Sequence, residues 1–268
     1  MTKSLRLLNQ IIAGGRETVS PAWVMAETGV SRQAAVNMLT RLCRQGLLDR
    51  VGHGHYALRQ LGVLGTAAAA EDQGLAVGAL FDGRPHRIAY RSALDQWDLL
   101  TRPWETVQVA SPLRLGHRTV SGRPLQLIKE SSETVGIGAV QVRGGAWVSD
   151  IERALIDCAA RPRLAGGIDP LAQGLASADR LDIGRLRSHL EKLHAGPAAR
   201  RIGSISAALG LENIASAMDP FAPTGFDYID LDPAEHRSAT ETSSGSLDRK
   251  WRVRWHLLPE ELANNVWR

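Results

Sequence analysis

The stretch SRQAAVNMLTRLCRQGLLDRVGHGHY, residues 31–56, decides the fold of the first part of this chain. Small and apolar residues recur in it every three or four positions, which is typical of a helix with one buried face. Ser31 is a good N-cap for this helix and Gly46 a good terminator. The segment LLDRVGHGHYALR, residues 47–59, then predicts two short strands joined by a tight turn. The buried face is expected to hold Ala34, Ala35, Met38, Leu39, Leu42 and Cys43, and the opposite face Arg32, Gln33, Val36, Asn37, Thr40, Arg41 and Arg44.

Two further helices are predicted before this stretch. The first has an apolar face and stops at Gly14-Gly15, where paired glycines favour termination. The second begins after Ser20, a good N-cap, with Pro21 in the first turn, where a missing N–H costs nothing. Helix, helix, tight turn, helix and two strands is the order of a winged helix-turn-helix. The apolar face of the first helix comprises Leu5, Leu7, Leu8, Ile11 and Ile12.

Positive charge is concentrated in the same segment. Residues 1–60 hold eight Lys or Arg against three Asp or Glu, whereas the net charge of the whole chain is +4. The remaining residues must therefore carry a slight negative balance. A basic excess confined to one domain is the pattern expected of a protein that binds phosphates.

A winged helix with this charge predicts contact with double-stranded DNA, the third helix entering the major groove. Gln33 and Asn37 can each pair with adenine, and Arg32 can pair with guanine, through two hydrogen bonds. Arg41, Arg44 and Arg50 are expected at phosphates, and His53 and His55 on the wing near the backbone or minor groove. The predicted DNA-binding set is Ser31, Arg32, Gln33, Asn37, Arg41, Arg44, Arg50, His53 and His55.

A winged helix used for protein contact is the alternative interpretation, in which these polar residues only form a solvated face. A metal site at His53 and His55 is not supported, because no third ligand accompanies them. The two cysteines, Cys43 and Cys158, lie far apart in amphipathic helical patterns and predict neither a disulfide framework nor a metal site.

Beyond residue 60 the pattern is mixed. An alanine-rich segment at 61–80 is expected to contain a linker, placed at 61–74, and a short helix. Alternating apolar residues after Pro103 predict a small antiparallel sheet, and amphipathic patterns from Ser149 onward predict a helical bundle, with Ser149 as an N-cap. The expected fold is α+β, with a winged helix at 1–60, the linker at 61–74 and a larger mixed domain at 75–268. Late in the chain, Trp251, Val253 and Trp255 alternate with Arg252 and Arg254, as in a strand with one buried face.

Several motifs behind the winged helix occur together in one order. They are IAYRSALDQWDLL (88–100), WVSDIERALIDCAARPRLAGGI (147–168), an Arg200-Arg201-Ile202-Gly203 turn into a helix ending at Leu209-Gly210, LDP (231–233), and the late strand with Arg254-Trp255. In this combination the chain resembles the AbiEi family, the antitoxin and transcriptional regulator of type IV toxin–antitoxin and abortive-infection systems. The block SDIERALIDC followed by Pro and Gly-Gly is the most specific part of the resemblance.

The resemblance implies a repressor of its own operon that binds inverted repeats in the promoter. It also implies that the C-terminal domain counteracts a nucleotidyltransferase-like toxin without forming a stable complex with it. An orphan regulator without a toxin is the alternative. Arg200, Arg201, Arg252 and Arg254 are expected to form a basic surface of this effector domain.

Catalysis is not expected. Asp150, Glu152 and Asp157 lie on one predicted helix, but no nearby His or Lys motif converges on them. The glycine pairs lack the context of a phosphate-binding loop, and no nucleophile signature occurs. We therefore predict no catalytic residue, cofactor or metal site, and an enzyme acting on nucleotides or RNA ranks third. The short apolar stretch at the N-terminus and the lack of a membrane-length apolar run predict a cytoplasmic protein without membrane contact.

Overall fold

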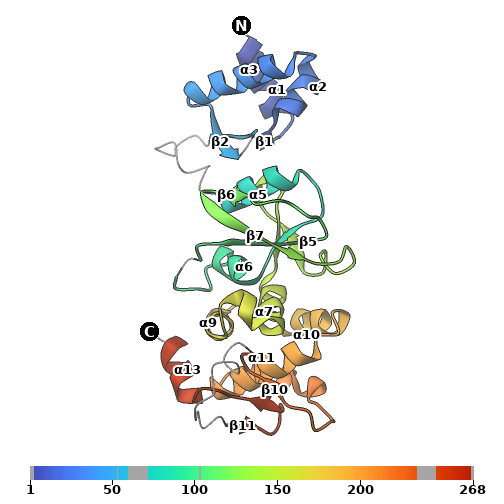
Figure 1. Cartoon of the computed structure of the whole chain (residues 1–268), viewed down its shortest axis with the longest axis vertical. Coiled ribbons are helices and arrows are strands. Elements are labelled where there is room, and N and C mark those ends of the chain that lie inside the picture. Colours follow the sequence, from blue (N-terminus) through green and yellow to red (C-terminus); the bar gives the residue numbers. More distant parts are fainter. Residues whose placement is uncertain (1–2, 53, 60–71, 103, 234–245, 267–268) are drawn as a thin grey trace. The chain divides into compact units, whose positions relative to one another are not determined.

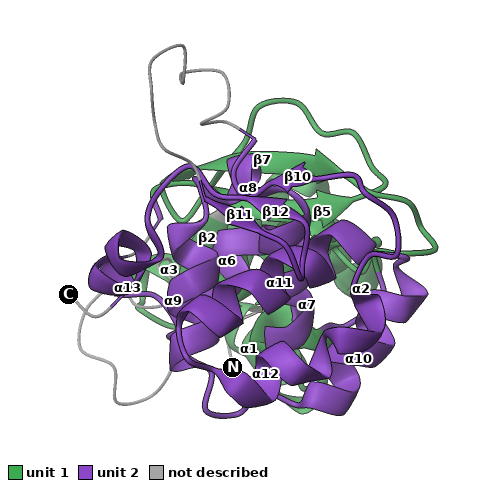
Figure 2. Cartoon of the chain, turned by 90° about the horizontal axis from the view of Figure 1, so that it is seen from below, with its two compact units in different colours: residues 1–88, 105–135, 140–148 green, residues 89–104, 136–139, 149–268 purple. Residues whose placement is uncertain are grey.

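The computed structural model describes residues 3–52, 54–59, 72–102, 104–233 and 246–266. They form two compact units, each assembled from separate segments (Figure 2). Unit 1 comprises 1–88, 105–135 and 140–148, and unit 2 comprises 89–104, 136–139 and 149–268. The domain limits 1–60, 61–74 and 75–268 stay predictions. The two compact units divide the chain elsewhere because the central sheet gathers strands from separate segments.

The N-terminal part of unit 1 has the predicted winged-helix order (Figure 1). Helices α1 (Lys3–Ala13), α2 (Pro21–Thr28) and α3 (Arg32–Arg44) precede the wing strands β2 (Leu48–Gly52) and β3 (His55–Leu58). The short strand β1 (Thr18–Val19) pairs with β3, so that the sheet order is β1-β3-β2. Ser20 caps α2 by accepting from the N–H of Trp23 at 3.3 Å, as predicted.

A single apolar core holds these helices to the wing. Its members are Leu7, Ile11, Val19, Val24, Ala35, Leu39, Leu42, Leu48 and Tyr56. The stripe predicted for α1 is only partly buried, because Leu5 and Ile12 are exposed. These two residues lie at the flanks of the buried line through Leu7 and Ile11, which are four positions apart on one helical face.

The rest of unit 1 is built around a six-stranded sheet with the order β6-β7-β5-β4-β9-β8. Helix α5 (Gln73–Phe81) belongs to the same unit, and Asp72 caps it. The last two residues of the predicted linker 61–74 are therefore helical, and residues 61–71 of the linker lie outside the described residues. The strands are β4 (Arg87–Ile88), β5 (Val107–Ser111), β6 (Thr119–Val120), β7 (Arg123–Lys129), β8 (Ala139–Gln141) and β9 (Trp147–Ser149), with the 3-10 turn η1 (Arg143–Gly145) before β9.

The sheet is mixed, which corrects the predicted antiparallel arrangement. Strands β5 and β7 run parallel, as do β4 and β9, while β4–β5 and β6–β7 are antiparallel. Alternation along a strand reports which face is buried and carries no information about the direction of its neighbour. Every residue of β5 is buried, as expected for a strand covered on both faces.

Unit 2 is mainly helical, as predicted. It contains α6 (Tyr90–Gln96), α7 (Ile151–Ala160), α8 (Pro162–Ala165), α9 (Asp169–Ser177), α10 (Ile183–Lys192), α11 (Gly196–Ala208), α12 (Glu212–Ala217), η2 (Asp219–Phe221) and α13 (Pro259–Val266). A small sheet of β10 (Ile229–Asp230), β12 (Val253–Arg254) and β11 (Leu247–Asp248) packs with them. The α+β class is therefore confirmed. The N-cap of α7 is Asp150 rather than the predicted Ser149, because the Asp150 carboxylate accepts from the N–H of Arg153 at 2.8 Å.

Candidate nucleic-acid interface

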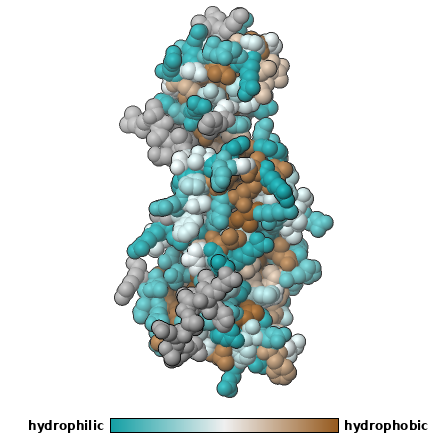
Figure 3. All heavy atoms as spheres, viewed as in Figure 1, coloured by the Kyte–Doolittle hydropathy of each residue, from teal (hydrophilic) through white to brown (hydrophobic). Residues whose placement is uncertain are grey.

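Helix α3 is amphipathic, with one apolar face and one polar face. Ala35, Leu39 and Leu42 are buried in the core of the winged helix. Seven of the nine residues predicted for DNA are exposed: Ser31, Arg32, Gln33, Asn37, Arg41, Arg44 and the wing residue Arg50. Hydrophilic residues also predominate on the face of the molecule drawn in Figure 3. The helical spacing therefore predicted correctly which polar residues of α3 are exposed.

The first two turns of α3 carry the predicted base-reading groups. The Ser31 hydroxyl accepts from the N–H of Ala34 at 3.3 Å, so its role is to cap the helix. The Gln33 amide nitrogen donates to the Asn37 side-chain oxygen at 3.1 Å, which aligns two amides one turn apart. Together they still offer the Gln33 oxygen as an acceptor and the Asn37 nitrogen as a donor. An acceptor and a donor side by side match the major-groove edge of adenine.

The cations of α3 lie at its other end. Arg41 and Arg44 occupy the last turn, and neither forms an ion pair with any residue that the structure describes. Exposed guanidinium groups without a carboxylate partner suit phosphate contacts, since no existing pair has to be broken. Arg59, by contrast, which contributed to the positive balance of residues 1–60, is paired with the buried carboxylate of Asp49.

The two wing histidines, His53 and His55, are the remaining members of the predicted DNA-binding set. His53 lies outside the described residues. His55 is half-buried in β3, and this burial lowers the pKa of its ring, with Asp82 opposing and Arg84 adding to the effect. His55 lines a cavity within unit 1 instead of standing free on the wing. Its contact with DNA stays a prediction, with a neutral imidazole as the donor or acceptor.

Arg200 and Arg201 do not belong to a basic surface, which corrects the sequence prediction. They are only 9% and 6% exposed, in the middle of α11. Arg200 donates to the carbonyl oxygens of Trp251 (2.8 Å) and Asp227 (2.7 Å), and also to that of Arg252. Arg201 donates to the carbonyl oxygens of Asp230, Leu231 and Ala159, at 3.0, 3.1 and 3.0 Å.

Both guanidinium groups therefore hold the segments around β10 and β12 against α11. Burial lowers the pKa of both arginines, with nearby aspartates opposing that effect. Sequence alone did not indicate this role, because the carbonyls that bind them come from segments far along the chain.

Arg252 and Arg254 are partly exposed, and each interacts with neighbouring side chains. The Arg254 guanidinium pairs with Asp230 at 2.8 Å. Arg252 stacks over the rings of Phe226 and Tyr228, at 5.6 and 5.5 Å from their centroids. The predicted alternation is confirmed, since Trp251, Val253 and Trp255 are buried. Of the predicted basic surface, only this pair of partly exposed arginines is present.

The carboxylates weighed for catalysis form a buried structural network in unit 2. Asp150 pairs with the His189 ring at 2.9 Å, and Glu152 accepts from the N–H of Asp182 at 2.7 Å. Arg153 and Asp157 pair at 2.8 Å along α7. Residues of the SDIERALIDC block, 149–158, thus join α7 to α10. Each carboxylate is already bonded, which favours the structural interpretation.

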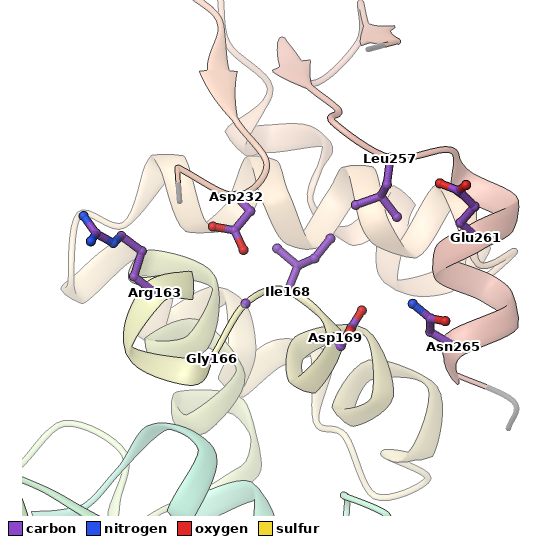
Figure 4. A pocket seen from close by; sticks show the side chains of 9 residues that line it. Arg163, Gly166, Ile168, Asp169, Asp232, Leu257, Glu261 and Asn265 are labelled. Atoms are coloured by element: carbon purple, nitrogen blue, oxygen red, sulfur yellow. The ribbon is translucent and has the colours of Figure 1, made fainter. Parts of the chain in front are cut away.

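A cavity of about 690 Å³ opens elsewhere in unit 2 (Figure 4). The carboxylates of Asp169, Asp232 and Glu261 line it together with Arg163 and Asn265. No serine, threonine, cysteine, lysine or histidine is among its described lining residues. Across the described part of the chain, no three His, Cys, Asp or Glu side chains are placed to hold a metal ion.

Comparison with known proteins supports the interpretation of the N-terminal part. Residues 2–55 match the model of the MarR family. The chain thus begins with a winged helix-turn-helix domain of a DNA-binding regulator type, and this favours a regulator over an enzyme. No helix among the described residues is both long and apolar enough to span a membrane. A search of curated proteins gives no match.

The fold as a whole resembles a solved structure, the crystal structure of the RV2827C protein from Mycobacterium tuberculosis. The TM-score is 0.59 at 14% identity, and the alignment covers 98% of this chain and 93% of that chain. At this identity the likeness concerns the fold alone. It extends the shared architecture well beyond the winged helix and through both units.

Proposed function

We propose that this protein is a cytoplasmic transcriptional autorepressor that binds inverted repeats in its own promoter through α3. The observation that carries the proposal is the segregation of α3 into a buried apolar stripe and an exposed face of amides and arginines. Arg32, Gln33 and Asn37 read bases, while Arg41, Arg44 and Arg50 contact phosphates. The match of residues 2–55 to the MarR family supports DNA binding but specifies neither operator nor regulated gene.

Substitutions at the two ends of α3 test this division of labour. Replacing Arg41 and Arg44 by Ala removes two phosphate contacts, so binding should weaken for every duplex and the salt slope should fall by about two. Gln33→Ala should instead change the preference among operator variants. The measurement is a fluorescence-anisotropy titration of the full chain at several salt concentrations.

A matched control removes the same charge elsewhere. Arg180 and Arg187 are exposed arginines of unit 2, so Arg180→Ala/Arg187→Ala should leave the affinity and salt slope unchanged. Normal operator binding by the Arg41→Ala/Arg44→Ala protein would show that the phosphate face has been assigned wrongly.

We further propose that the protein is the antitoxin of a type IV toxin–antitoxin system and counteracts a nucleotidyltransferase-like toxin without a stable complex. Support comes from the motif resemblance, whose most specific block builds the α7–α10 network. Co-expression with a nucleotidyltransferase encoded beside the gene should restore growth that the enzyme alone arrests, while the two proteins do not co-purify. Co-purification would favour direct binding, and the absence of rescue would favour an orphan regulator.

A further inference from the structure

Unit 1 contains a cavity of about 770 Å³ between the wing and the elements that follow it. Val51 of β2 and His55 of β3 line it from the wing, and Ala76 and Leu80 of α5 line it from the body. This volume falls within the range of small-molecule sites, roughly 300–1,000 Å³. Nine of its eleven lining residues lie outside the 2–55 segment that matches the MarR family, so the cavity is mostly built by the rest of this chain.

The lining combines an apolar wall with cations. Leu80, Leu115, Val120 and Pro124 offer hydrocarbon surface, and none of the described lining residues is acidic. The cations are Arg84 and Arg118, with the imidazoles of His55 and His117 beside them. An apolar wall with convergent positive groups complements a ligand that is apolar at one end and negatively charged at the other.

The two arginines are available for such a ligand. Arg84 is oriented by bonds from its Nε and one terminal nitrogen to the carbonyl oxygens of Phe81 (2.8 Å) and Leu80 (2.7 Å), at the end of α5. Arg118 donates to the adjacent His117 carbonyl at 3.0 Å. Both are exposed, and neither forms an ion pair with a described residue. Their remaining N–H groups can bind an anion without breaking an existing pair.

We propose that this cavity is a binding site for a small amphipathic organic anion, and that its occupant acts on the wing. A carboxylate, sulfonate or phosphate group binds Arg84 and Arg118, and the hydrocarbon part packs against Leu80, Leu115 and Val120. A bare DNA phosphate shares the charge but leaves the apolar wall in water, so the lining favours the organic anion. The effect on the wing rests on the proposed DNA binding, whereas the binding site itself does not.

Two dyes that differ only in one sulfonate group test the site directly. Anilinonaphthalene sulfonate carries the anionic group, and N-phenyl-1-naphthylamine has the same ring system without it. The full chain should bind the sulfonate more tightly than the neutral dye, as measured by fluorescence titration. Arg118→Gln and Arg84→Gln should each weaken sulfonate binding by about tenfold and leave the neutral dye unaffected.

Arg114→Gln is the matched control, because Arg114 is exposed on the same loop but does not line the cavity. Arg118 is exposed, so its substitution keeps the test valid even if loss of Arg84 unfolds the end of α5. Equal affinities of wild type, Arg118→Gln and Arg84→Gln for the sulfonate would overturn the site, as would an equal loss in Arg114→Gln.

The wing effect has a separate readout. Saturating sulfonate should change operator affinity several-fold for the wild type and not for Arg118→Gln. Dye binding without any change in operator affinity would retain the site and overturn the coupling to the wing. A chain that binds the dye as expected but no operator at all would contradict the proposed function, and the coupling with it, and leave the site standing.

Discussion

At the scale of single residues, the arginines of this chain do three different things that their charge does not distinguish. Arg41 and Arg44 are exposed and face solvent, Arg59 pairs with Asp49, and Arg200 and Arg201 are buried against backbone carbonyls. Charge alone predicts that all of these arginines lie at the surface. The local pattern identifies only the first kind, because an exposed helical face is encoded by spacing and a clamp between distant segments is not.

Arg201→Lys should therefore reduce stability rather than DNA binding. A lysine cannot reach the three carbonyl oxygens that the guanidinium holds, so buried acceptors lose their donors. We expect a loss of about 2 kcal/mol in the free energy of unfolding, measured by urea denaturation. Arg187→Lys, an exposed change of the same kind, should have no effect, and equal stabilities of the two variants would refute the clamp.

His86 gives the protein a predictable response to acid. Its ring is buried and stacks on Phe81 at 4.4 Å, with Nδ1 at 2.7 Å from the Arg84 carbonyl and Nε2 accepting from the N–H of Trp147. Burial lowers the pKa of His86 from its usual 6.5, so in acid the unfolded chain binds a proton that the folded chain does not. This contribution to stability is complete above pH 6.5 and decreases as the pH falls below it.

His86→Gln should flatten that dependence, since glutamine does not titrate in this range. The check is a series of denaturation curves from neutral pH to about pH 5, compared with wild type. A slope that is unchanged by the substitution would assign the acid sensitivity to other groups, His55 being the next candidate because burial lowers its pKa as well.

At the scale of elements, α5 lies against the turn η1 at a position where only glycine fits. A Cβ on Gly78 would overlap the Gly144 carbonyl and come within 2.8 Å of the Ala146 nitrogen. Because both neighbours are backbone, neither can yield, and Gly78→Ala should cost about 3 kcal/mol of unfolding free energy. Gly196→Ala is the control, since no heavy atom lies within 4 Å of its added Cβ. Comparable stability of the two proteins in thermal denaturation would contradict this packing.

The sequence predicted elements well where their signals are local. The caps at Ser20 and Ser31, the stripe of α3 and the inward tryptophans around β12 follow from spacing of neighbouring residues. Strand direction in the six-stranded sheet could not be predicted in this way. The pairing joins segments that are not neighbours in the sequence, such as Val107–Ser111 and Arg123–Lys129. The α7–α10 network and the wing cavity were missed for the same reason, since each draws its members from separate segments.

At the scale of the whole molecule, a winged helix with exposed arginines on α3 precedes a unit in which several buried charged side chains bond to one another or to backbone carbonyls. The Asp150–His189 and Arg153–Asp157 pairs and the buried Arg200 and Arg201 use charged side chains of unit 2 to hold its own segments together. We therefore expect DNA contact in the N-terminal part, where exposed arginines of α3 lie beside exposed amides.

The most direct test of DNA recognition is an electrophoretic mobility shift of the full chain on the DNA upstream of its own gene, with a scrambled duplex of equal length as competitor and salt as the variable. A sequence-specific repressor retains the promoter fragment in excess scrambled DNA at moderate salt, and its affinity falls steeply as salt rises. Equal competition by the scrambled duplex, or loss of all binding at moderate salt, would contradict the account and leave the winged helix as a scaffold for protein contact.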